Sequence, residues 1–409
     1  MIVYIAQLKE GMTLASKATA PNGRLLLPAG TVLTEQHLRV FNIWGVSEAD
    51  IVDPEGAPDT QPSLEADAAS AQAQDHAAAL FAAADTATPP MAALKAVCIQ
   101  EYTGQLVQSG TLPAPPQRPM RPQPPSEPAP PRALADFIAA DTGLTSLPDI
   151  YDKITRALDD PLCSANRLAD VISKDPGISA RLLRLVNSPL YGAAQRIESL
   201  DRAVCLVGAQ ELSQLALGVT VMATFQGVGS AAFPMAAFWR HSLACAVFSR
   251  ILAAQVAGAS RDRCFVAGML HDLGRLVMFK IAPEAMGRAI QLAQANGVPM
   301  HRAEREVFGF SHCQVATALM ETWNLPPALT GVVAGHHGPA DGEHRVEAAI
   351  CAMGDVLAIA LQHGSNGSGL VHAPFDGAWE ALGLPESALA TTVLKAHRQI
   401  DDILAIFLR

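Results

Sequence analysis

The side chains in this chain that could carry out chemistry are histidines and aspartates, all in its C-terminal half. Imidazole and carboxylate groups are ligands for zinc, iron and manganese, so their convergence in one pocket would form a metal site. Adjacent His-Asp and His-His pairs do not share a helix face as ligands at i and i+4 do. Spacing alone therefore leaves two readings open, a metal site or a set of buried, hydrogen-bonded histidines. The candidate ligands are His241, His271, Asp272, His312, His336, His337 and Asp355.

The region that must position these residues, 133–409, predicts helices throughout. Apolar residues recur at i, i+3 and i+4, and Asp-Pro and Asn-Ser-Pro sequences end two of the helices. Strand-like alternation of useful length does not interrupt the pattern, so we expect a large all-α domain. The expected helices cover 168–172, 178–186, 203–206, 212–225, 238–256, 263–278, 284–296, 312–323, 327–334 and 346–361.

Residues 1–54 have the pattern of a small β-plus-helix module. Short apolar runs at 3–5 and 25–27 have the length of strands, and 46–52 could form a closing strand. Thr34 precedes a helical pattern and is a suitable N-cap. We expect this module to fold separately from the helical domain.

Residues 55–132 differ in composition from both neighbours. Fifteen of the 40 residues in 55–94 are alanine, and ten of the 19 residues in 113–131 are proline. Proline disrupts helices and sheets. The alanine-rich part could form a helix, but it has too few large apolar residues to anchor a core. This segment, which carries seven acids and one base between 55 and 110, is expected to be an acidic, largely disordered linker.

Whole-chain composition narrows the class of protein. The chain has 409 residues, half of them apolar, and a net charge of −10. Such a chain can bury a large core, while its negative charge argues against a general nucleic-acid binder. Seven cysteines without a CxxC pair are typical of reduced thiols in a cytoplasmic protein.

One uncharged stretch is long enough to be considered as a membrane span. Residues 212–239 carry no charge, but glutamines, a glycine-rich cluster and Pro234 interrupt them. The mostly apolar part, 212–225, is too short to cross a bilayer. We therefore expect a buried helix and no membrane insertion. The N-terminus lacks the basic and apolar regions of a signal peptide, which agrees with a cytoplasmic location.

The order of the candidate ligands resembles the HD superfamily of metal-dependent phosphohydrolases. In that family the residues equivalent to His241, the His271-Asp272 pair and Asp355 bind a first metal ion. His312 and the pair 336–337 match the extra ligands of two-metal members such as the HD-GYP phosphodiesterases. The resemblance thus implies one or two ions of iron, manganese or zinc. If the chain is active, Asp272 and Arg275 are the implied catalytic residues, with Arg275 near a substrate phosphate.

Longer motifs resemble the HDOD family (HD-related output domain) more closely. Residues 172–192 read ISKDPGISARLLRLVNSPLYG, and 199–208 read SLDRAVCLVG. Leu147-Pro148 and the sequences at 323–326 and 336–339 also match, so the similarity covers about 144–361. Residues 1–54 resemble the small module that precedes some HD-GYP domains.

This resemblance implies a non-catalytic regulatory or scaffold role in bacterial signal transduction, with signalling proteins as partners and a homodimer as a further option. HDOD domains are signalling modules, most of them without established catalytic activity. The chain lacks the Gly-Tyr-Pro element of the cyclic-dinucleotide phosphodiesterases: residues 336–341 read HHGPAD. Two alternatives stay open, a metal-dependent phosphohydrolase acting on a nucleotide or cyclic dinucleotide, and a non-hydrolytic nucleotide sensor.

Overall fold

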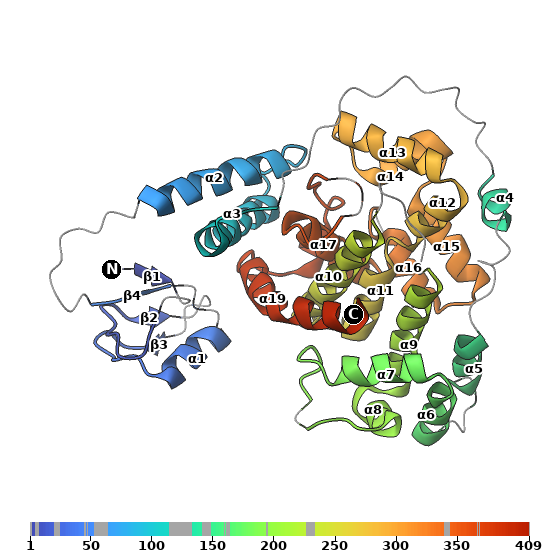
Figure 1. Ribbon diagram of the computed structural model, residues 1–409, viewed down its shortest axis with the longest axis horizontal. Helices are drawn as coiled ribbons and strands as arrows, with labels where there is room; N and C mark the ends of the chain where they lie inside the picture. The colour runs from blue at the N-terminus through green and yellow to red at the C-terminus, as the bar shows by residue number, and fades with distance from the viewer. Residues whose placement is uncertain are drawn as a thin grey trace.

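The computed structural model has two helical parts and a small mixed module (Figure 1). It describes residues 2–4, 8–19, 25–44, 46, 48–52, 64–113, 133–140, 149–158, 160, 164–193, 195–225, 234–338, 344–365, 367 and 369–408. The all-α fold expected for the main domain is confirmed, together with the small strand-containing module at the N-terminus.

The N-terminal module forms two short antiparallel sheets and one helix. Strand β1 (Ile2–Tyr4) pairs with β4 (Glu48–Asp50), and β2 (Ala18–Thr19) pairs with β3 (Leu25–Leu27). Helix α1 (Glu35–Trp44) begins after Thr34, whose Oγ1 accepts a hydrogen bond from the backbone N of His37 at 3.3 Å. Its core, which includes fully buried Leu14, Leu33 and Phe41, is separate from that of the main domain.

The alanine-rich part of the expected linker is instead a packed helical hairpin. Helices α2 (Leu64–Leu80) and α3 (Pro89–Ser109) pack against each other, and α3 contacts α17 and α19. The Tyr102 hydroxyl donates to the Ala360 carbonyl. The expectation of disorder is therefore wrong for these residues. The reason is a stripe on α3 with helical spacing, which the alanine count concealed: Met91, Leu94, Cys98, Tyr102 and Leu106 are all buried.

The proline-rich remainder of that segment, residues 114–132, lies outside the described residues, as do Leu147 and Pro148. Among the described residues the chain resumes in six helices, and the sequence predicts the last four of them. Ser164 caps one of them by accepting from the Arg167 backbone N at 3.2 Å, and Asp175 caps the next at 2.9 Å. These helices are α4 (Leu134–Ala139), α5 (Asp149–Leu158), α6 (Ala165–Ser173), α7 (Pro176–Val186), α8 (Leu200–Val207) and α9 (Ala209–Thr224).

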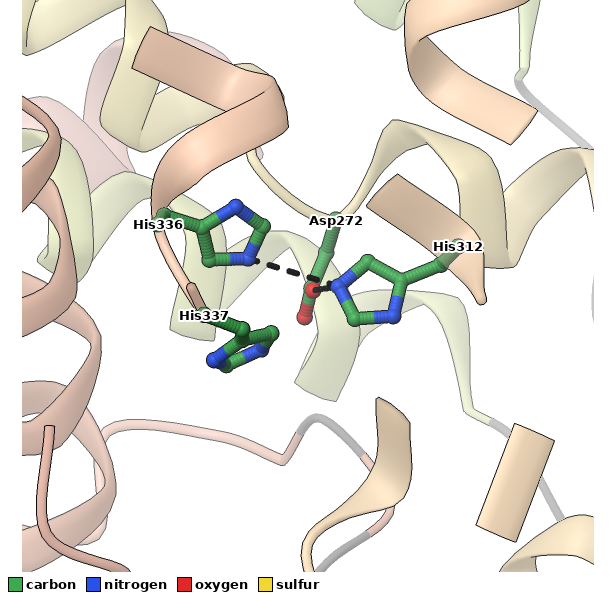
Figure 2. A group of neighbouring side chains, drawn as sticks. All are labelled: Asp272, His312, His336 and His337. Atoms are coloured by element: carbon green, nitrogen blue, oxygen red, sulfur yellow. Dashed lines mark hydrogen bonds and ion pairs between the residues drawn. The ribbon is translucent and has the colours of Figure 1, made fainter. Parts of the chain in front are cut away.

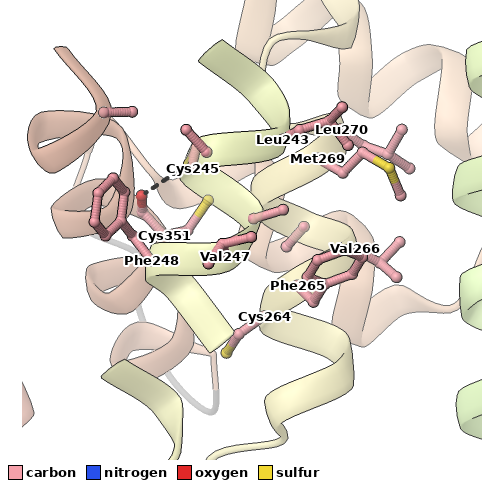
Figure 3. Packing of buried hydrophobic residues seen from close by; sticks show 14 of the residues in the cluster. Leu243, Cys245, Val247, Phe248, Cys264, Phe265, Val266, Met269, Leu270 and Cys351 are labelled. Carbon is pink, nitrogen blue, oxygen red and sulfur yellow. Dashed lines mark hydrogen bonds between the residues drawn. The ribbon is translucent and has the colours of Figure 1, made fainter. Parts of the chain in front are cut away.

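Helix α10 (Met235–Ala253) is the centre of the main domain. It is buried along most of its length and packs against α11 (Arg261–Leu270), α17 (Arg345–Ala360) and α19 (Ser387–Phe407). Figure 3 shows side chains of α10 packed against those of α11. The other helices of this region are α12 (Leu273–Ile281), α13 (Pro283–Asn296), α14 (Met300–Phe308), α15 (His312–Thr322), α16 (Pro327–Gly335) and α18 (Ala378–Leu382).

The single helix expected over 263–278 is in fact two. Helix α11 ends at Leu270, with His271 as its C-cap; the backbone leaves helical geometry at Asp272 (φ −96°, ψ 11°), and α12 starts at Leu273. Each of the two helices is buried up to the break. The apolar periodicity of the sequence therefore continues across it. The break therefore coincides with two candidate ligands.

Three glycines beside candidate ligands allow the helices to approach closely. A Cβ at Gly268 would lie 2.8 Å from the Ala246 Cα, and one at Gly274 would lie 2.0 Å from the His312 carbonyl oxygen. A Cβ at Gly354 would lie 2.9 Å from the Cys245 carbonyl oxygen. These separations involve backbone atoms, so a side chain cannot be accommodated by a rotamer change.

No single helix among the described residues combines the length and apolar character needed to cross a bilayer. Helices α8 and α9 together meet those criteria, but only as a pair bent by 116°. Residues 212–224 belong to the buried helix α9, as the sequence predicts.

Replacing Gly354 with alanine should destabilise the fold, because the added methyl group would collide with α10. We expect a loss of about 1–3 kcal/mol in unfolding free energy. Gly287→Ala on α13 is the matched control: a Cβ there meets nothing within 4 Å. Alanine at that helical position should be neutral or stabilise by up to about 1 kcal/mol. Urea unfolding of both variants measures the difference, and equal stabilities would contradict the close packing.

Candidate metal centre

Seven candidate ligands converge where five segments of the main domain meet. His241 projects from α10, His271 and Asp272 form the break between α11 and α12, and His312 is the first residue of α15. The remaining three lie at the end of α16 and on α17. The structure thus brings together all the predicted ligands: His241, His271, Asp272, His312, His336, His337 and Asp355.

One half of the cluster surrounds the Nε2 atoms of His241 and His271. These two nitrogens lie 3.4 Å apart. Asp355 Oδ1 lies 3.0 Å from the Nε2 of His241 and 3.6 Å from that of His271. Asp272 Oδ2 lies 3.3 Å from the Nε2 of His271. All four side chains are buried.

The other half uses the second oxygen of the same aspartate. Asp272 Oδ1 lies 3.2 Å from His312 Nε2, and that nitrogen lies 3.3 Å from His336 Nε2. Figure 2 shows the rings of His312 and His336 pointing toward each other beside the Asp272 carboxylate, with His337 next to His336. Asp272 is therefore shared between the two halves, one oxygen facing each.

Hydrogen bonds behind the cluster set the tautomer of three imidazoles. The Nδ1 atoms of His271 and His336 lie 2.8 and 2.6 Å from the carbonyl oxygens of Gly268 and Val333. His312 Nδ1 lies 2.5 Å from Glu304 Oε2. Carbonyl and carboxylate oxygens only accept, so each Nδ1 must donate its proton. The neutral ring then directs the lone pair of Nε2 into the cluster, as metal-bound histidines require.

This arrangement fits a divalent transition metal. Two nitrogens bound to one tetrahedral ion at about 2.0–2.1 Å lie about 3.3 Å apart, which matches the separations across both halves. Facing lone pairs repel one another unless a cation or a proton lies between them. Asp272 Oδ1, which faces the second half, is also buried without a hydrogen-bond partner among the described residues. An all-nitrogen and oxygen donor set suits iron, manganese or zinc.

The charges around the cluster favour a cation. Burial would raise the pKa of Asp272, but Arg275 and His271 hold it well below its usual range. Burial also opposes ionisation of Glu304, yet His312 and Arg275 lower its pKa to about 2. The pKa of Asp355 is lowered as well. Three buried carboxylates are therefore ionised in one region, and Arg275 balances only part of their negative charge.

Arg275 lies behind the ligands. Its Nε donates to Glu304 Oε1 at 2.9 Å, a second nitrogen donates to Asp272 Oδ2, and the residue is 1% exposed. Two carboxylates therefore hold the guanidinium, which orients Asp272 and Glu304. Its expected contact with a substrate phosphate stays a prediction, and this geometry does not favour it.

Glu304 is the residue that sequence reasoning missed. It lies on α14, is fully buried, and also accepts a hydrogen bond from the backbone N of His312 at 2.8 Å. Its only signal in the sequence is its position eight residues before His312, which matches no ligand spacing. The fold alone shows that it orients a ligand.

A cavity of about 370 Å³ adjoins the cluster. The ligands His336, His337 and Asp355 form one side of it. Arg275 of α12 also borders it, as do residues of α14 and of the loop after α17, including His301, Arg302, His372, Phe375 and Asp376. The cluster thus borders a cavity large enough for a small molecule.

Glu304→Gln should weaken metal binding about 10- to 100-fold, because the uncharged amide is a weaker acceptor for His312 Nδ1. Competition with a coloured chelator measures the affinity. Glu306→Gln is the matched control, since Glu306 is an exposed residue on the same helix. Equal affinities for the two variants would show that Glu304 does not support a ligand.

Acidic pH should release the metal. Burial opposes protonation of His271, but Asp272 and other neighbours raise its pKa well above the ordinary value in the metal-free chain. The metal-free form therefore holds protons that metal binding must displace, so lowering the pH favours it. Metal content after dialysis at pH 5 should be lower than after dialysis at pH 8. Equal retention at both pH values would contradict proton competition.

Comparisons with known proteins agree with this fold. The family model of the HDOD domain matches residues 144–339. An uncharacterised protein of Treponema pallidum is 26% identical over 199 residues, which are 47% of this chain and 37% of that protein. This chain therefore aligns with little more than a third of that relative's length.

Two solved structures share the fold over most of the chain. An HDOD domain protein from Geobacter sulfurreducens, of unknown function, is 24% identical with a TM-score of 0.55, covering 68% of this chain and 97% of that one. A protein of Shewanella amazonensis, provisionally named a phosphohydrolase, is 22% identical with a TM-score of 0.53, covering 68% and 98%. The convergent His/Asp cluster, the helical fold and the family match lead to one conclusion: this chain contains an HDOD domain, with its family-matched part at residues 144–339.

Proposed function

We propose that this protein is a regulatory protein of bacterial signal transduction whose HDOD domain binds one or two divalent transition-metal ions. The proposal rests on three imidazoles of the cluster. Their Nδ1 atoms donate hydrogen bonds to acceptors behind the cluster, so their Nε2 atoms converge on both sides of Asp272. A cytoplasmic location and signalling proteins as partners belong to the same proposal.

The residues of the cluster link parts of the chain that are distant in sequence. His241 on α10 and Asp355 on α17 lie 114 positions apart, and the α11–α12 break contributes His271 and Asp272 between them. A bound ion would hold these helices in one arrangement by coordination. Occupancy of the centre would then be transmitted to the helix surfaces that a partner protein contacts.

The surroundings of Arg275 favour regulation over hydrolysis. A phosphohydrolase needs cationic groups that are free to orient phosphoryl oxygens. Arg275 is committed to Asp272 and Glu304, and the Gly-Tyr-Pro element is missing from the sequence.

One observation supports hydrolysis as a second candidate function. The cavity reaches His336, His337 and Asp355, so a small substrate could approach the centre. A metal ion held there would supply activated water at neutral pH. Asp272 would hold the ion, and Arg275 would keep that carboxylate ionised and oriented. A nucleotide sensor without turnover would use the same cavity.

Asp272→Ala should remove the metal, because this carboxylate serves both halves of the cluster. We expect near-stoichiometric iron, manganese or zinc in untagged wild-type protein purified without chelators, and a loss of most of it in the variant. Elemental analysis measures both. Asp170→Ala, at an exposed position on α6, is the matched control and should keep its metal. Wild-type protein without metal, even after reconstitution with each ion, would overturn the proposal.

The two functions differ in turnover. The reconstituted wild-type protein should leave phosphodiester and nucleotide substrates intact while its thermal stability depends on the metal. Metal-dependent hydrolysis that disappears in Asp272→Ala, but not in Asp170→Ala, would establish the second candidate instead.

A further inference from the structure

The loop that follows α17 forms one wall of the cavity beside the metal centre. We call residues 361–377 the strap; all but 366 and 368 are described. Five consecutive strap residues, 372–376, border the cavity. The strap lies beyond the family-matched segment, which ends at residue 339.

Two imidazoles on different walls of the cavity have buried, unpaired nitrogens. His301 Nδ1 on α14 and His372 Nε2 on the strap have no hydrogen-bond partner among the described residues. Each nitrogen is almost fully enclosed, so its ring must turn about the Cβ–Cγ bond before a ligand in the cavity can reach it. A buried polar group without a partner costs about 1–3 kcal/mol, so a ligand that satisfies it gains affinity. His301 also stacks on His337, with ring centroids 4.6 Å apart, which places it next to the metal centre.

The strap is held in place by the α2–α3 hairpin. The backbone N of Val371, adjacent to His372, donates to the Leu80 carbonyl at the end of α2, at 2.9 Å. His76 Nε2 lies 2.8 Å from Gln362 Oε1 at the start of the strap. Val371 is fully buried, so the position of His372 depends on the docking of the hairpin.

The cavity limits the chemistry and size of its ligand. Its 370 Å³ is near the lower end of the range of about 300–1,000 Å³ for small-molecule sites. Two cations among the described residues border it: Arg275, which Asp272 and Glu304 hold, and exposed Arg302, which has no such partner in that part of the chain. Asp376 also borders the cavity and disfavours a ligand that is negatively charged throughout. A ligand with one anionic end and a neutral polar body meets both conditions.

We propose that the cavity binds a small oxyanion-bearing molecule, no larger than a nucleoside monophosphate, and that His301 and His372 are its specificity-determining residues. The α2–α3 hairpin positions His372 for this role. The inference rests on the proposed metal centre, because the ligands His336, His337 and Asp355 form part of the same cavity. The inference names the class of the ligand. It also identifies the α2–α3 hairpin as a positioning element outside the family-matched segment.

Calorimetric titration of the full chain tests the ligand site, using inorganic phosphate, adenosine and guanosine 5′-monophosphates, and a cyclic dinucleotide as probes. Each titration is run on metal-loaded protein and on chelator-treated protein. We expect a monophosphate to bind and the cyclic dinucleotide not to bind. His372→Ala should weaken that binding about tenfold with unchanged metal content. His37→Ala, in the N-terminal module, is the matched control and should bind like wild type.

Tyr102→Phe tests the role of the hairpin. It removes the hydroxyl that donates to Ala360 but keeps the buried ring. Faster hydrogen exchange at the Val371 amide and weaker monophosphate binding, with metal content unchanged, are the expected results.

The inference would be overturned by no monophosphate binding in either form of the wild type, by equal binding by His372→Ala, or by preferential binding of the cyclic dinucleotide. Monophosphate binding by a protein that never takes up metal would instead overturn the proposed metal centre alone. Phosphate binding with the affinity of the monophosphates would show that only the oxyanion is recognised, which contradicts a specificity role for His372.

Discussion

The carboxylate of Asp272 is the constraint on which the site depends. Each of its oxygens faces a different pair of imidazoles, so five segments of the domain must meet around one side chain. Gly268, Gly274 and Gly354 make this meeting possible, because a Cβ at any of them would overlap backbone atoms of a neighbouring helix. The same contacts that pack the core therefore bring the ligands within reach of one another.

The cluster is also an electrostatic arrangement that is incomplete without a cation. Buried carboxylates that stay ionised need compensation, and Arg275 supplies only part of it. Protons on His271 or a metal ion can supply the rest, which couples occupancy of the site to pH. Glu304 contributes to both the charge balance and the orientation of the ligands, because it accepts a hydrogen bond from Arg275 and orients His312.

The sequence predicted the all-α fold and the short module, because helical periodicity and short apolar runs are local features. The resemblance to the HD superfamily supplied the seven candidate ligands, which the structure brings together, and their binding of a metal stays a prediction. The break at His271–Asp272 was missed, since apolar periodicity continues across it. The packed α2–α3 hairpin was missed because composition concealed the stripe from Met91 to Leu106. Glu304 could not be predicted, since only the fold brings α14 beside His312. The domain boundaries and the likeness of the N-terminal module to that of HD-GYP proteins stay predictions.

X-ray absorption at the edge of the bound metal identifies the atoms that bind it. If the ion lies among these histidines and aspartates, its ligands are nitrogen and oxygen at about 2.0–2.2 Å, with outer scattering from imidazole rings. Cys313 lies close by, with its Sγ 3.5 Å from His312 Nε2, and is the alternative donor. A sulfur ligand at about 2.3 Å, or a shell without imidazole scattering, would contradict the account.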